Sequence, residues 1–147
     1  MIDKEHQAIA KGRDLSVSTK NCIEICNQIR NKSTKRAKTI LQEAIDKKIP
    51  IPFLRFNKNK GHKTGPLYSG AFPQDASKEI LNLIKSAEKN AQNQGLNEEN
   101  LYIKLIMANR ASQPFRYGRQ KRRKAKRTHV DIILEEKEVT KKKEEKK

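Results

Sequence analysis

The residues able to bind a metal ion or perform catalysis are few and scattered in this sequence. Cys22 and Cys26 have C-x-x-x-C spacing, but a structural zinc site needs four ligands and no second cysteine or histidine pair completes the set. His6, His62 and His129 have no paired carboxylate or nucleophile nearby in the sequence. Neither a glycine-rich phosphate loop nor a G-x-S-x-G motif is present. The sequence therefore predicts no metal site, no cofactor and no enzyme active site, and it predicts that both cysteines are buried core thiols.

The most distinctive chemical property of the sequence is its excess of positive charge. The 147 residues include 34 lysines and arginines against 17 aspartates and glutamates, so the net charge is +17. Such a chain repels itself and is attracted to polyanions, which makes nucleic acid the leading class of partner. The charge is concentrated in residues 109–129, which contain nine basic residues and no acidic one. These main candidates for phosphate contacts are Arg110, Arg116, Arg119, Lys121, Arg122, Arg123, Lys124, Lys126 and Arg127.

A second acid-free segment, residues 54–65, contains further basic side chains. Its candidates for RNA binding are Arg55, Lys58, Lys60, His62 and Lys63, to which we add Lys11, Arg13, Arg30 and Arg36 from elsewhere in the chain. We expect Phe53 and Phe56 to pack as a lid over the helices; the alternative is that Arg55 or Phe56 stacks on an RNA base. Phe115 and Tyr117 have little core within reach, so we expect them to stack on bases or wedge between them.

Periodic apolar residues predict the elements that must position these cations. Helical spacing predicts helices over residues 18–30, 33–48 and 73–94, with Ser16 or Ser18 capping the first and Ser33 the second. Pro50 and Pro52 end the second helix, and Gly95 follows the third. Alternating apolar residues predict strands over residues 101–108 and 130–134, and residues 13–17 are a candidate third strand.

The basic segment between the last two predicted strands is expected to form a hairpin that continues both strands outward and turns near residues 112–119. Ten residues at about 3.3 Å each reach over 30 Å, whereas a body of about 100 residues has a radius of gyration near 13 Å. The hairpin should therefore project from the body. Because an isolated two-stranded ribbon is marginally stable and these charges repel one another, we expect it to be mobile when free and ordered when polyanion surrounds it.

The predicted organisation is one RNA-binding domain, residues 1–134, with an extended basic hairpin over about residues 103–133. Residues 135–147 contain six lysines and five glutamates with a single apolar residue, Val139, and are expected to form a charged flexible tail. No apolar run approaches the roughly 18 residues of a membrane span, and residues 1–10 lack the apolar stretch of a secretory signal. Two cysteines cannot build a disulfide scaffold, so we expect a reducing compartment.

Several segments, in order, are similar to one protein family. They are AKGRDLSVS at residues 10–18, IPFLRFN at residues 51–57, NLIKSAEKNA at residues 82–91 and THVDIILEEKE at residues 128–138. Together these segments resemble large-subunit ribosomal protein twenty-two of the archaeal and eukaryotic type, numbered seventeen in the older eukaryotic scheme. The last segment is especially close to the eukaryotic form. The hairpin departs from the usual eukaryotic sequence: it looks shorter, and its arginine cluster before the tip is reduced to residues 111–115. A reduced eukaryotic ribosome, such as that of a parasite, would fit these departures.

This resemblance implies an α+β fold in which three helices pack on a three-stranded antiparallel sheet with a long projecting β-hairpin. It implies a structural constituent of the large ribosomal subunit that binds the large-subunit rRNA, supports subunit assembly and acts as a monomer within the ribosome. The implied location is the cytoplasm, with assembly in the nucleolus if the source is eukaryotic. Neighbouring large-subunit ribosomal proteins are further implied partners.

By the same resemblance, the hairpin lines the nascent-peptide exit tunnel, and the nascent polypeptide is a partner at its tip. Residues 116–119 match the family's tip motif, with Tyr117 where a histidine is usual in eukaryotes. The implied tip residues are Gln113, Pro114, Phe115, Tyr117 and Gly118.

The residues alone leave one other interpretation open, an architectural protein that bends DNA with basic β-arms. Pro114 near a hairpin tip is compatible with it, because apolar tip residues can wedge between base steps. Such a protein would dimerise to present two arms, so its oligomeric state and a competition between duplex DNA and structured rRNA separate the two hypotheses.

Overall fold

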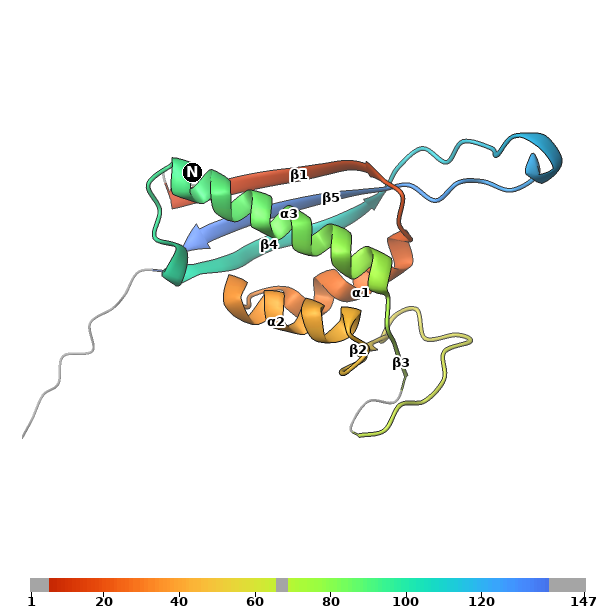
Figure 1. The fold of residues 1–147 in the computed structure, drawn as a ribbon, viewed down its shortest axis with the longest axis horizontal. Coiled ribbons are helices and arrows are strands. Elements are labelled where there is room, and N and C mark those ends of the chain that lie inside the picture. Colours follow the sequence, from red (N-terminus) through yellow and green to blue (C-terminus); the bar gives the residue numbers. More distant parts are fainter. Residues whose placement is uncertain (1–5, 66–68, 138–147) are drawn as a thin grey trace, which may run out of the picture.

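The computed structural model describes residues 6–65 and 69–137 of the chain. Strands β1 (Gln7–Leu15), β4 (Leu101–Arg110) and β5 (Thr128–Glu136) form an antiparallel sheet in the order β1-β5-β4. Helices α1 (Thr19–Ile29), α2 (Thr34–Ile45) and α3 (Gln74–Asn93) cover one face of this sheet (Figure 1). This arrangement confirms the predicted α+β fold of three helices on a three-stranded antiparallel sheet.

The alternation predicted for the last strand determines which face is buried. Val130, Ile132 and Leu134 are fully buried under the helices, while the residues between them are only partly covered. The apolar stripes of the helices supply the other half of the core, and Ile84 and Ala87 of α3 are also fully buried. Burial of such side chains contributes about 1.5–3 kcal/mol for each large aliphatic group, so this one layer holds the sheet and the helices together.

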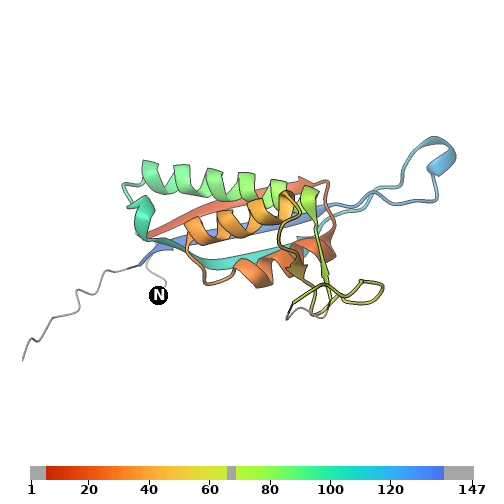
Figure 2. The same cartoon turned by 60° about the horizontal axis from the view of Figure 1, so that its bottom comes forward.

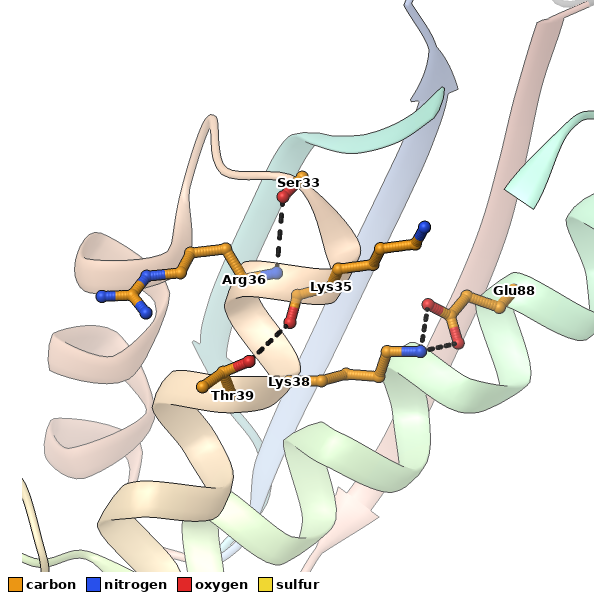
Figure 3. A network of polar contacts seen from close by, with 6 residues as sticks. All are labelled: Ser33, Lys35, Arg36, Lys38, Thr39 and Glu88. Carbon is orange, nitrogen blue, oxygen red and sulfur yellow. Dashed lines mark hydrogen bonds and ion pairs between the residues drawn. The ribbon is translucent and has the colours of Figure 1, made fainter. Parts of the chain in front are cut away.

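Two of the predicted helix boundaries are confirmed, the start of α2 and the end of α3, but α2 ends at Ile45, five residues before Pro50, and the chain turns at Lys47 with φ = 59°. Ser33 caps α2, because its side-chain oxygen accepts a hydrogen bond from the backbone N–H of Arg36 at 3.4 Å (Figure 3). Gly95 follows α3 with φ = 78°, a left-handed conformation that glycine adopts without strain. Ser18 occupies the N-cap position of α1, but its side chain makes no capping hydrogen bond. Ser16 lies outside that position, so the prediction of a capping serine holds for α2 alone.

The N-terminal strand is longer and starts earlier than predicted. β1 spans Gln7–Leu15 instead of residues 13–17, and its residues facing the helices are Ala8, Ala10 and Gly12. A Cβ at Gly12 would lie 3.3 Å from Leu83 of α3, so small residues are needed where this helix lies close to the strand. Small residues give a weak apolar alternation, which explains why the sequence pattern missed most of the strand.

Two further elements differ from the prediction. A two-stranded pair, β2 (Ile51–Pro52) and β3 (Gly70–Ala71), was not predicted, and it closes the long connection between α2 and α3. The tail predicted from residue 135 begins too early, because β5 continues to Glu136. The part of the predicted tail from residue 138 onward lies outside the described residues. Within the described residues, the helices are too short or too polar to cross a membrane.

Candidate nucleic-acid interface

The basic hairpin extends well beyond the end of the sheet (Figures 1 and 2). Its strands do not continue outward as predicted over residues 103–133: β4 ends at Arg110 and β5 begins at Thr128. Beyond them the two arms are joined by three backbone hydrogen bonds: Ala111 N–H to Arg127 C=O at 3.2 Å, and Ala125 N–H to Pro114 C=O and Arg116 N–H to Arg123 C=O, both at 2.8 Å. One isolated antiparallel bridge pairs Phe115 with Lys124. The arms therefore do run outward together, but the continuous ladder predicted over residues 111–127 is interrupted. Pro114 has no N–H to donate, and the repelling cations oppose regular pairing.

The hairpin turns later than predicted. A short 3₁₀ turn, η3 (Gly118–Gln120), begins the reversal and the chain completes it at residues 121–122, not within residues 112–119. Gly118 has φ = 65°, a conformation that favours glycine. Phe115 and Tyr117 lie beside this turn with 58% and 96% of their surfaces exposed. The ring of Phe115 lies under the Lys124 ammonium at 4.8 Å, whereas Tyr117 presents its whole ring to solvent.

Eight of the nine cations of the hairpin are exposed, and Arg127 at its root is half-buried. Within the described residues none of the nine forms an ion pair with an acidic side chain. Five of them share a hollow of about 470 Å³, which the hairpin forms together with Ser16 and Gln120. Those five are Arg116, Arg123, Lys124, Lys126 and Arg127. A smaller hollow of about 350 Å³ lies at the turn and is lined by residues 119–123. Guanidinium and ammonium groups gathered in this way form a site for phosphate oxygens.

The root of the hairpin is fixed to the body by a buried hydroxyl. Thr128 is fully buried, and its Oγ1 donates a hydrogen bond to the Val17 carbonyl at 2.9 Å. The same oxygen lies 2.8 Å from Oγ1 of Thr19, at the start of α1. Nearby, the guanidinium of Arg127 donates to the Asp14 carbonyl at 3.4 Å. The direction in which the hairpin leaves the sheet is therefore set by contacts that the sequence pattern did not reveal.

The second basic segment forms a loop between β2 and β3. Phe53 is buried, as the lid interpretation predicts, and Phe56 is half-buried. Cations lie over both rings: Lys60 over Phe53 at 4.7 Å and Arg55 over Phe56 at 5.2 Å. Of the five predicted RNA-binding residues of this loop, Lys60 is half-buried, and the other four, Arg55, Lys58, His62 and Lys63, are exposed.

The four remaining candidates have different surroundings. Arg13 lies on the open face of the sheet and pairs with Asp131 at 3.1 Å, and Lys11 is exposed on the same strand. Arg30 donates a hydrogen bond to the Ile106 carbonyl at 3.3 Å on the edge of β4. The guanidinium of Arg36 is exposed and points away from the contact between α2 and α3 (Figure 3). Arg13 and Arg30 thus already have partners within the fold.

The two ends of the molecule differ in charge. The hairpin leaves the end of the three-stranded sheet, and the basic loop emerges from β2 and β3, beside the helices, toward the same side of the molecule (Figures 1 and 2). The other end carries the acidic residues of η2 (Glu98–Asn100) and the end of β5, where Glu135 lies beside Lys104 and Tyr102. The hydrogen bond from Lys104, followed by that from Tyr102, lowers the pKa of Glu135. The pKa of Tyr102 is raised, because its hydroxyl donates to that carboxylate.

The cysteines are not available for chemistry. Both are buried on α1, as predicted, and burial raises the pKa of each thiol to about 12. For Cys26, burial is the main cause of the raised pKa, and the charge of the neighbouring Cys22 thiolate contributes to it. In the part of the chain that the structure describes, no group of three or more cysteine, histidine or acidic residues could hold a metal ion.

Comparison with known proteins decides the family. Residues 10–135 match the family described as ribosomal protein L22p/L17e. The chain belongs to this family. Similar relatives are the large ribosomal subunit protein uL22 of Methanococcus maripaludis, 38% identical over 141 residues that cover 91% of this chain and 92% of the relative, and that of Methanosphaera stadtmanae, 37% identical over 139 residues that cover 90% of each. The protein of the same name from Nanoarchaeum equitans is 36% identical over 92% of this chain and 82% of its own length.

Membership of the L22p/L17e family confirms the resemblance found in the sequence. As a ribosomal protein, the chain is a structural, non-enzymatic component. The relatives named above are archaeal, so they lend no support to the expectation of a eukaryotic source or of assembly in a nucleolus. Within the described residues the chain has one long basic hairpin. Because the chain belongs to a family of ribosomal proteins, this hairpin is better explained by the ribosomal hypothesis than by the alternative of a DNA-bending protein with two arms.

Proposed function

We propose that this chain is a structural constituent of the large ribosomal subunit, where it binds rRNA and supports subunit assembly. The family match covers residues 10–135, and the archaeal relatives carry the name of a large-subunit protein. Its partners would be the large-subunit rRNA and neighbouring ribosomal proteins, within a ribosome in the cytoplasm. The chain would act there as a single copy.

The observation that carries this proposal is the hairpin. Nine cations lie within residues 110–127, no acidic residue lies among them, and the described fold supplies them with no ion-pair partner. Inside a folded protein, charges of this density would require compensation, so the compensating anions must come from outside. RNA phosphates between closely packed helices supply them, and each contact releases counterions on binding.

The distribution of charge over the whole molecule favours one orientation. Because the basic loop and the hairpin lie toward the same side of the molecule, both can contact RNA at once, while the opposite end with Glu98, Glu99 and Glu135 would face away from phosphate. Arg36 and Lys11 would add contacts from the sides of the body. Arg13 and Arg30 would contribute less, because each already has a partner within the fold.

We propose that the tip of the hairpin lines the nascent-peptide exit tunnel. Of the implied tip residues, Gly118 lies in the turn that ends the hairpin and Tyr117 directly precedes it, whereas Gln113, Pro114 and Phe115 lie on the arm between β4 and that turn. Phe115 and Tyr117 are both exposed, and Tyr117 has the largest exposed fraction among the large hydrophobic side chains described. Such rings would stack on rRNA bases or face the nascent polypeptide.

The test is incorporation of tagged protein into large subunits that are washed at high salt. Weakly held basic proteins are removed as phosphate contacts are screened, whereas an integral component remains. We expect Arg122→Ala/Arg123→Ala to reduce incorporation without unfolding the body, because both side chains are exposed. The matched control is Arg122→Lys/Arg123→Lys, which retains the charge and should incorporate better than the alanine variant. Equal incorporation of the alanine variant and the wild type would refute the role of the hairpin.

A further inference from the structure

Glu24 is an acidic residue buried in a strongly basic chain. Its side chain lies on the inner side of α1 with 1% of its surface exposed. Its Oε1 accepts hydrogen bonds from the backbone N–H groups of Arg55 at 2.9 Å and Phe56 at 2.7 Å, and its Oε2 accepts one from Leu54 at 3.2 Å. Three consecutive backbone N–H groups therefore surround one carboxylate, in the way that such groups bind anions elsewhere in proteins.

The charge of Glu24 is compensated by the loop backbone itself. Burying a carboxylate costs free energy unless hydrogen bonds satisfy it, and charge-assisted hydrogen bonds are the strong ones. Within the described residues no basic side chain forms an ion pair with Glu24. The loop has few other backbone restraints, such as Phe53 N–H to Ser69 C=O at 2.9 Å and Lys60 N–H to Asn57 C=O at 3.1 Å. The conformation of residues 54–56 therefore depends on this carboxylate.

The loop fixed in this way carries the second group of cations. Arg55 lies within residues 54–56, and Lys58, Lys60, His62 and Lys63 follow directly. The ring of Phe56 is approached both by Arg55 at 5.2 Å and by Lys20 of α1 at 5.6 Å, which further defines where the loop lies. Cations that are already positioned lose less conformational entropy when they bind phosphate.

We propose that Glu24 is a positioning residue for RNA binding. By holding residues 54–56 it presents the cations of the loop to rRNA phosphates, as a second contact beside the hairpin. The inference rests on the proposed function, because it assumes that the chain binds rRNA. It assigns to a buried acidic residue, which itself would repel phosphate, an indirect role in binding a polyanion.

The test compares RNA binding by Glu24→Gln in two backgrounds. Glutamine retains the volume but removes the charge and places an N–H₂ group where a carboxylate oxygen accepted a hydrogen bond. The probe is a transcript of large-subunit rRNA, and the measured quantity is the slope of log affinity against log salt. In the wild-type background we expect the slope to fall by about 0.7 to 0.9 for each phosphate that the loop no longer neutralises. In the background Arg55→Ala/Lys58→Ala/Lys60→Ala we expect Glu24→Gln to cause no further fall.

A matched control removes a different acidic side chain. Glu88 of α3 pairs with Lys38 of α2 at 2.9 Å, away from the loop (Figure 3). Glu88→Gln should leave the slope unchanged. Amide hydrogen exchange at residues 54–56 should accelerate in Glu24→Gln and not in Glu88→Gln. If Glu24→Gln fails to fold, Glu24→Asp retains the charge on a shorter side chain and should give a smaller fall of the slope in the same direction.

The outcomes separate this inference from the proposed function. If the wild type binds the transcript and Glu24→Gln binds with the same affinity and slope, the positioning role is refuted. An equal loss in both backgrounds would also refute it, because the residue would then act through overall stability. If the wild type itself does not bind rRNA, the proposed function fails first, whatever Glu24 does.

Discussion

Removing two hairpin lysines should weaken RNA binding in a way that depends on salt. Lys124 and Lys126 both line the 470 Å³ hollow, and both are exposed. If each neutralises one phosphate, Lys124→Ala/Lys126→Ala leaves two phosphates without a cation and lowers the slope of log affinity against log salt by about 1.4 to 1.8. When salt rises fourfold, from about 50 to about 200 mM, the ratio of wild-type to variant affinity should therefore shrink by about sevenfold to twelvefold.

The assay is binding to a large-subunit rRNA transcript at several salt concentrations. The matched control is Lys85→Ala/Lys89→Ala, which removes the same charge from exposed positions on α3. The control should retain the wild-type slope, and both variants should unfold at the wild-type urea concentration, because surface substitutions change stability by about 0.5 kcal/mol or less. Equal slopes for the two variants would refute the reasoning, since net charge alone would then explain binding.

Three further predictions concern the body of the protein. Cys22 and Cys26 should resist alkylation at pH 8 in the folded protein and react on unfolding, because burial raises both pKa values to about 12. The pKa of Glu135 is lowered in the folded protein, so its contribution to stability is present above the unfolded pKa, about 4.3, and is lost as the pH falls through the folded pKa. Lys104→Met removes the main cause of the lowered pKa and should therefore reduce this loss of stability. The measurement is urea unfolding at pH 3 to 6. Thr128→Val should lower the free energy of unfolding by about 1–3 kcal/mol, because it removes a buried hydroxyl and leaves a carbonyl without its donor.

The Thr128→Val prediction has a matched control, and each of the three predictions has an outcome that would contradict it. Thr39→Val removes a hydroxyl that bonds the Lys35 carbonyl on the exposed side of α2 (Figure 3), and it should change stability by about 0.5 kcal/mol or less. Rapid alkylation of the native thiols would contradict their burial. An unchanged acid sensitivity in Lys104→Met would show that this lysine does not hold the carboxylate charged. A neutral Thr128→Val would show that the hairpin root is fixed by other contacts.

The sequence pattern predicted those elements whose apolar residues face one large core. The stripe of α3 with Gly95 after it, the cap at Ser33 and the alternation of β5 each depend on local geometry that a short segment carries within itself. β1 was mostly missed, because Ala8, Ala10 and Gly12 are small where α3 lies close. Its strand character depends on β5 and α3, both distant in the sequence.

The distribution of charge in the sequence predicted where the candidate interface lies, and the structure showed which of its cations already have partners within the fold. The acid-free segments show which cations lack acidic neighbours in the sequence, and the hairpin and the loop lie toward the same side of the molecule. Which cations are already partnered, such as Arg13 and Arg30, depends on contacts across the fold. The sequence pattern could not predict the contacts of Glu24 and Thr128 for the same reason, since their partners lie 30 or more residues away in the chain.

The most direct test of the account is amide hydrogen exchange over residues 111–127, measured in the free protein and in assembled large subunits. The free hairpin has few backbone hydrogen bonds and no core, so its amides should exchange rapidly. In the subunit the same amides should be strongly protected, because RNA would surround them. Strong protection in the free protein, or rapid exchange in the subunit, would contradict the claim that folded RNA orders this hairpin.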